Sequence, residues 1–161
     1  MKNPRAAKET VSVSRDIAAT PERIWALVTD LTRMGEWSPE NKGGEWSEGA
    51  TGPALGACFK GANSNKNRNW KTTVVVVAFD APTKFAFALR VGKAHWCDWV
   101  FEIEPIANGS HVTHSWIDRR SKLTNWVGGI VSKVENRAEH NSKNMAATLE
   151  ALAKTAVSES H

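Results

Sequence analysis

Residues 123–157 read LTNWVGGIVSKVENRAEHNSKNMAATLEALAKTAV. Apolar and small side chains recur in this stretch at helical spacing and form one stripe, while charged side chains occupy the opposite side. The stripe contains Leu123, Val127, Ile130, Val131, Val134, Ala138, Met145, Thr148, Leu149, Leu152 and Ala156. The pattern predicts a long amphipathic helix that packs its apolar side against another element. We expect a bend near Gly128-Gly129, where two glycines weaken the helix.

One polar residue, Asn141, interrupts the apolar stripe near its centre. A buried amide that lacks hydrogen-bond partners costs about 1–3 kcal/mol. A strand side chain, a trapped water or a ligand must therefore satisfy this amide. The sequence leaves a structural role and a ligand-binding role equally open.

The chain before this helix carries the signals of a sheet. Alternating apolar and polar residues between turn-forming segments predict strands at Thr10–Ala18, Gly56–Asn63, Trp70–Phe79, Lys84–Val91, Ala94–Pro105 and His111–Asp118. The glycine-rich segment Gly43–Gly52 is predicted to form a short strand and a turn. Asn63–Asn69 is a polar hairpin loop, and Asn108-Gly109 is a typical hairpin turn. Short strands joined by hairpins indicate an antiparallel sheet, and the C-terminal helix is the element long enough to cover its apolar face.

Two short helical segments follow the first predicted strand. Thr20-Pro21-Glu22 begins a helix, with Thr20 as the N-cap and proline at the first helical position. That helix extends over Pro21–Asp30, and Arg33–Trp37 forms a second helical turn.

Length and composition limit the kind of protein. A chain of 161 residues can build one sizeable core, and we expect a flexible tail at residues 1–9 and a single domain at residues 10–157. A net charge of +4 spread along the chain argues against a dedicated nucleic-acid binder. Two cysteines, no signal peptide and no long apolar run predict a cytoplasmic protein without stable membrane insertion. No metal-ligand spacing or phosphate-binding loop is visible, so we expect no cofactor, and the oligomeric state stays open.

Several stretches carry a resemblance that covers nearly the whole chain. They are Val11–Trp25, Leu55–Gly61 with Trp70, Pro82 with Phe85, Trp99–Pro105, and the spacing His140-Asn141…Met145…Leu149. These stretches and the order of elements resemble the helix-grip fold of the START and birch-pollen-allergen-like (SRPBCC) superfamily, in its polyketide cyclase/dehydrase and lipid-transport-like branch. The resemblance implies an α+β fold: a curved antiparallel sheet of about seven strands around a long C-terminal helix, with two short helices after the first strand and a cavity between sheet and helix. It does not fix the function.

The apolar faces of the predicted strands supply candidate cavity residues. If these faces point toward the helix, the ligand-binding candidates are Phe59, Trp70, Phe87, Leu89, Trp99, Phe101 and Trp116 from the strands, with Val134, Asn141 and Met145 from the helix. Each of these side chains taken singly is more often core, but so many large rings favour at least one cavity wall. We expect a pocket of a few hundred Å³ whose lining includes Trp99, Trp116 and Phe87.

Polar candidates are few. His114 shares a strand face with Trp116 and is a weak candidate for a general base, with a structural interior histidine as the more common alternative. Arg137, at the edge of the helix stripe, could reach an anionic head group or form a surface ion pair. We assign Asp98 and Asp118 to outward faces.

Three functions stay open at this stage. The first is binding of a small hydrophobic or amphipathic molecule, lipid or polyketide-like. The second is a cyclase- or dehydratase-like reaction on a ligand in the same cavity, and the third is a protein-interaction module with a filled core. The partner expected under the first two is a small hydrophobic molecule.

Overall fold

The computed structural model of the chain describes residues 9–120 and 137–158. The elements in order are strand Glu9–Ile17 (β1), helix Pro21–Val28 (α1), 3₁₀ helix Leu31–Glu36 (η1), strands Asn41–Ser47 (β2), Cys58–Asn65 (β3), Arg68–Asp80 (β4), Lys84–Val91 (β5), Ala94–Ile106 (β6) and Gly109–Asp118 (β7), and helix Arg137–Ser158 (α3). The predicted order of elements is confirmed. The predicted start of the last helix, including Gly128-Gly129, lies outside the described residues. Within them, no helix is long and apolar enough to cross a membrane.

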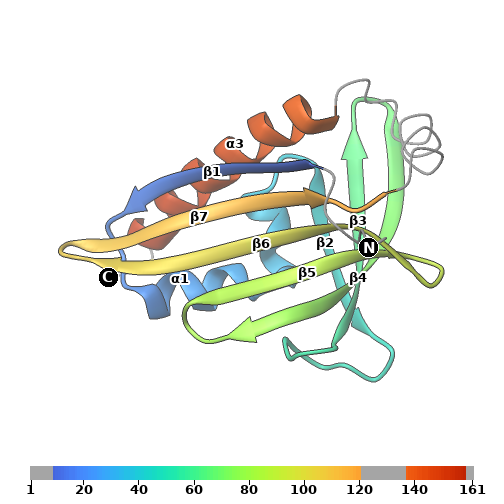
Figure 1. The fold of residues 1–161 in the computed structure, drawn as a ribbon, viewed down its shortest axis with the longest axis horizontal. Helices are drawn as coiled ribbons and strands as arrows, with labels where there is room; N and C mark the ends of the chain where they lie inside the picture. Colours follow the sequence, from blue (N-terminus) through green and yellow to red (C-terminus); the bar gives the residue numbers. More distant parts are fainter. Residues whose placement is uncertain (1–8, 121–136, 159–161) are drawn as a thin grey trace, which may run out of the picture.

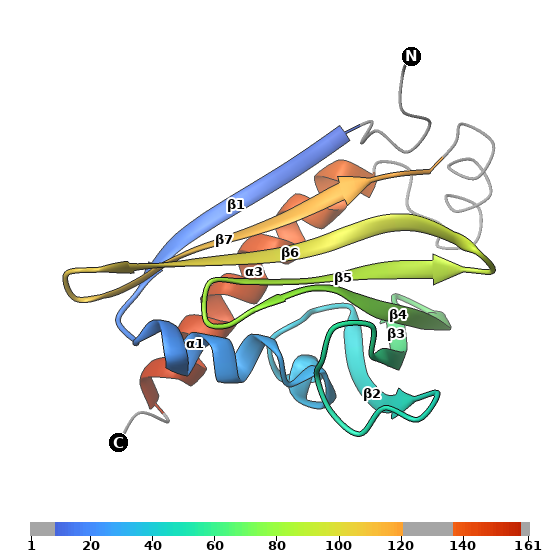
Figure 2. The ribbon, with the colours of Figure 1, turned by 60° about the horizontal axis from the view of Figure 1, so that its bottom comes forward.

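The seven strands form one antiparallel sheet in the order β1-β7-β6-β5-β4-β3-β2. Strands β2 to β7 each lie beside their neighbours in sequence, and β1 closes the other edge against β7. The segment with α1 and η1 therefore crosses from one edge of the sheet to the other. Figures 1 and 2 show the curved sheet, with α3 (red) running along β1 and β7 on one side of it. This arrangement confirms the helix-grip fold.

Local sequence explains where elements begin and turn. The Thr20 hydroxyl accepts a hydrogen bond from the Arg23 backbone N–H (3.2 Å) and caps α1, as expected. At the β6–β7 hairpin, Gly109 has a φ of 153°, and a Cβ atom there would lie 2.1 Å from the carbonyl oxygen of Ile17. Only glycine lets β1 approach this hairpin so closely.

The sheet face beneath α3 is packed at one end. Leu149, Leu152 and Ala156 of α3 join Ile103 of β6 and Val112 of β7 in the hydrophobic core. The same cluster includes Ile17, Ile24, Leu27, Val28 and Leu31 from β1, α1 and η1. The preceding turns of α3, from Asn141 to Thr148, border a cavity instead.

Two sequence assignments are corrected by the structure. Phe59 is buried in the core and not on the cavity wall, because Trp46 of the neighbouring strand β2 packs against its ring with centroids 5.2 Å apart. Asp118 was assigned outward but is buried, where it forms an ion pair with Arg120 (Nε to Oδ1, 3.0 Å). Asp118 lies two residues after Trp116, so strand alternation places both on the inward face.

Candidate ligand-binding site

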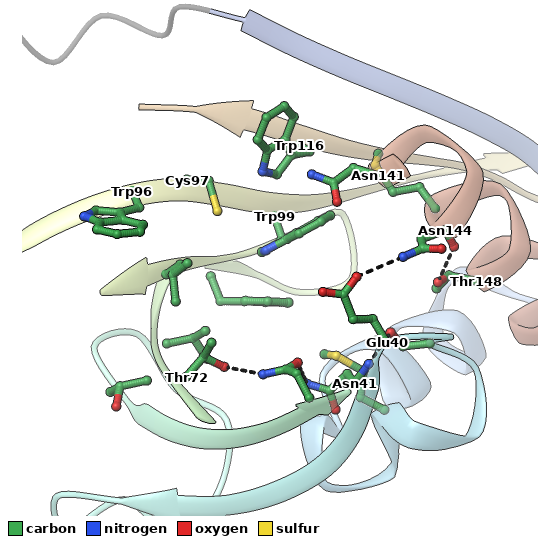
Figure 3. A pocket seen from close by; sticks show the side chains of 18 of the residues that line it. Glu40, Asn41, Thr72, Trp96, Cys97, Trp99, Trp116, Asn141, Asn144 and Thr148 are labelled. Carbon is green, nitrogen blue, oxygen red and sulfur yellow. Dashed lines mark hydrogen bonds between the residues drawn. The ribbon is translucent and has the colours of Figure 1, made fainter. Parts of the chain in front are cut away.

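A cavity of about 540 Å³ lies between the sheet, the first described turns of α3 and the segment joining η1 to β2 (Figure 3). Its wall contains most of the candidates from the sequence: Trp70, Phe87, Leu89, Trp99, Phe101, His114, Trp116, Asn141 and Met145. The expected pocket is therefore present, with the expected aromatic lining. Whether these residues bind a ligand stays a prediction.

The aromatic wall follows from strand register. Phe87 of β5 is opposite Trp99 of β6, which is opposite Trp116 of β7. Directly opposed residues in an antiparallel sheet point to the same face, so the three rings form a continuous surface. The Trp99 and Trp116 ring centroids are 6.5 Å apart at an interplanar angle of 45°.

Asn141 is a buried polar group whose amide lacks a partner. Its side chain is only 1% exposed, and its Nδ2 atom has no hydrogen-bond partner among the described residues. Figure 3 shows the amide between Trp116 and Trp99, directed into the cavity. An unsatisfied buried donor costs about 1–3 kcal/mol, so an acceptor that reached this atom, on a ligand or a water, would remove that cost.

His114 is buried in the same wall, and one of its two ring nitrogens has a hydrogen-bond partner. Its Nδ1 donates to the carbonyl oxygen of Val100 (3.0 Å), since a carbonyl can only accept. Its ring stacks on Phe101 with centroids 3.9 Å apart. Burial lowers the pKa of His114 to about 4. The imidazole is therefore neutral at pH 7, with a lone pair left on Nε2.

The arginines in the wall are held by carboxylates of the protein. Arg120 pairs with the buried Asp118, and its guanidinium carbon lies 5.8 Å from the centre of the Trp116 ring. Arg90 donates to Glu48 through Nη2 at 2.8 Å. Neither guanidinium is left without a counterion inside the cavity.

A polar side of the cavity was not anticipated from the sequence. The Glu40 Oε2 atom lies 2.7 Å from His140 Nε2 and accepts a hydrogen bond from Asn144 Nδ2 at 3.1 Å, which joins the start of β2 to α3 (Figure 3). Nearby, Asn41 donates to Asn63 (3.3 Å), and Asn63 donates to Thr72 (3.0 Å). The sequence pattern ends the strand at Asn63, before a loop, whereas β3 continues to Asn65. Thr72 could have been predicted in the wall, because it alternates with Trp70 and Val74 on one face of the same strand.

Two predicted site residues cannot be placed. Val134 lies outside the described residues. Arg137 begins α3, but its side chain also lies outside them. Within the part of the chain that the structure describes, no group of three or more His, Cys, Asp or Glu residues could hold a metal ion.

Comparison with known families agrees with the fold and the cavity. The family model described as "Polyketide cyclase / dehydrase and lipid transport" matches residues 8–156. The chain belongs to this family. The resemblance noted in the sequence is thereby confirmed.

Several solved structures are similar to this family member. The solution structure of the Polyketide_cyc-like protein Cgl2372 from Corynebacterium glutamicum is 30% identical, with a TM-score of 0.62, and covers 91% of this chain and 90% of its own. The di-domain ARO/CYC protein StfQ from the steffimycin biosynthetic pathway is 11% identical, with a TM-score of 0.70 over 92% of this chain and 50% of its own. Major latex-like protein 151 from Panax ginseng is 10% identical, with a TM-score of 0.69 over 91% and 96% of the two chains. The last two show the shared fold alone. No curated protein matches the chain.

Proposed function

We propose that this family member binds a small hydrophobic or amphipathic molecule in the cavity between the sheet and α3. The observation that carries the proposal is a cavity of about 540 Å³ into which the unpaired amide of Asn141 points. Ligand sites in proteins typically enclose about 300–1,000 Å³, with a mostly apolar wall and a few polar groups. Both features argue against a protein-interaction module with a filled core.

A cyclase- or dehydratase-like enzyme is the second candidate, because the family description includes those activities. Such a reaction needs a group that exchanges protons near neutral pH. With its pKa lowered to about 4, His114 is a weak base at pH 7. We therefore place binding before catalysis, and we propose that Trp99, Trp116 and Met145 contact the ligand.

The cell compartment and the extent of the unit belong to the same proposal. Cys58 and Cys97 are both free and buried, which suits the reducing compartment expected from composition. We propose that residues 10–157 act together as one ligand-binding domain in the cytoplasm.

Native mass spectrometry of freshly purified protein tests this proposal. We expect a population whose mass exceeds that of the chain by a few hundred daltons, and the added mass should disappear under denaturing conditions. Protein that carries no added mass, and that takes up no neutral hydrophobic probe when one is supplied, would overturn the proposal.

A further inference from the structure

We infer that the cavity selects an uncharged ligand that carries carbonyl-type acceptor oxygens and discriminates against the corresponding carboxylate. This inference rests on the proposed function and specifies the chemical class of the ligand. It concerns the buried part of the cavity beside Trp99, Trp116 and Asn141, and it follows from which polar groups there are already paired.

The cavity offers neutral donors that the protein does not use. Nδ2 of Asn141 is buried without a partner. The indole nitrogen of Trp99 also has no hydrogen-bond partner among the described residues, and Figure 3 shows it on the cavity side of the ring. A ligand carbonyl oxygen would satisfy the free N–H groups of Asn141 and Trp99.

The described residues of the same wall offer little to a negative charge. The two arginines that reach it, Arg90 and Arg120, are neutralised by Glu48 and Asp118, as described above. The Glu40 side chain adds a carboxylate to the wall. Lys71 is exposed, so water solvates its ammonium group at the rim. The chain carries a net charge of +4, but the described part of the cavity contains no corresponding excess of positive charge.

Desolvation then decides between the two ligand classes. A carboxylate that leaves water without a counterion loses far more free energy than a ketone that exchanges one hydrogen bond for another. The neutral donors of Asn141 and Trp99 compensate the ketone and only part of the loss of the carboxylate. An uncharged carbonyl compound is thus the preferred occupant.

Three probes that share one ring system test the inference by isothermal titration calorimetry at pH 7.5. Acetylnaphthalene carries a ketone, naphthoate a carboxylate, and naphthalene no polar group. We expect acetylnaphthalene to bind about five- to tenfold more tightly than naphthalene. Naphthoate should bind at least about tenfold more weakly than acetylnaphthalene. Naphthoate binding as tightly as the ketone would overturn the inference, while failure of all three probes would overturn the proposed function itself.

Two matched variants locate the donor. Trp99→Phe keeps a ring in the wall but removes the free N–H, and it should lower the affinity for acetylnaphthalene several-fold more than the affinity for naphthalene, because only the ketone uses the donor. Phe87→Leu shrinks another ring of the same wall that carries no N–H, so it should lower the affinity for both probes by a similar factor. A Trp99→Phe protein that loses affinity for the two probes by the same factor would contradict the assignment of Trp99 as a donor. Asn141→Leu removes the second donor, Nδ2, and its effect on the affinity for acetylnaphthalene is measured in the same titration.

Discussion

At the scale of single residues, Asn141 and His114 show how a structural polar group differs from an available one. Both are buried in the cavity wall, at 1% and 5% exposure. The carbonyl of Val100 occupies Nδ1 of His114, whereas Nδ2 of Asn141 has no partner among the described residues. A helix that served only to fill a core would be more stable with leucine at position 141.

Replacing Asn141 by leucine should therefore separate binding from stability. We expect the affinity for a neutral carbonyl probe to fall by about 1 kcal/mol or more, because the ligand loses a buried donor. The free energy of unfolding should stay the same or rise, since an unsatisfied amide is removed. Calorimetric titration and urea denaturation measure the two quantities. Unchanged binding together with a large loss of stability would show that Asn141 serves the core.

His114 predicts a pH dependence of stability. Its folded-state pKa is lowered from 6.5 to about 4, so the unfolded chain binds more protons between these values. Stability should fall as the pH decreases from about 6.5 toward 4, by an amount on the order of 3 kcal/mol, and His114 adds no further change below that window.

The variant His114→Phe isolates this contribution, because the new ring can stack on Phe101 but cannot titrate. Urea denaturation of both proteins from pH 4 to pH 7.5 should give curves that diverge at low pH, with the wild type losing more stability. Parallel curves over the whole range would contradict the neutral, buried assignment of His114.

At the scale of secondary-structure elements, periodicity predicted the strands and helices but not all of their neighbours. The alternation in β5, β6 and β7 placed Phe87, Trp99 and Trp116 on one face because register preserves alternation across neighbouring strands. Phe59 obeys the same alternation, yet the ring of Trp46 on the neighbouring strand β2 packs against it. Which strands are neighbours depends on the order of strands in the sheet, and alternation within one strand contains no information about that order.

The polar side of the cavity escaped prediction for a related reason. Glu40 follows a proline, and Asn41 and Asn63 belong to segments whose composition is typical of turns. Their part in the wall arises only when β2 and β3 are brought opposite α3, through contacts such as Glu40 with Asn144. No local pattern marks such a contact between residues about a hundred positions apart.

The two parts of α3 predict different responses to truncation. Leu152 is fully buried in the packed end of the core, so Leu152→Ala should lower the free energy of unfolding by about 2–5 kcal/mol. Val157, on the same helix but 42% exposed, is a matched control, and Val157→Ala should change stability by less than about 0.5 kcal/mol. Urea denaturation measures both. Similar small effects would mean that α3 does not pack on the sheet as described.

At the scale of the whole molecule, one sheet face serves two purposes. Its end beneath Leu149, Leu152 and Ala156 is filled by side chains from α1, α3 and the strands. Its other end carries large rings that stand around an open volume. The sequence predicted the rings and the covering helix. The hollow depends on how far α3 and the η1–β2 segment stand from the sheet, which is a property of the assembled fold.

We propose that this volume accepts a ligand, and a substitution that fills the volume is the sharpest test of that proposal. Leu89→Trp replaces an aliphatic side chain of the wall by the larger indole ring. Val77→Trp adds the same ring at an exposed position outside the wall. Each protein is titrated with the neutral ketone dye prodan, and the shift of the dye emission is followed. We predict saturable binding to the wild type and to Val77→Trp, and its loss in Leu89→Trp with folding retained. Equal binding by all three proteins, or none by the wild type, would show that the ligand does not occupy this volume.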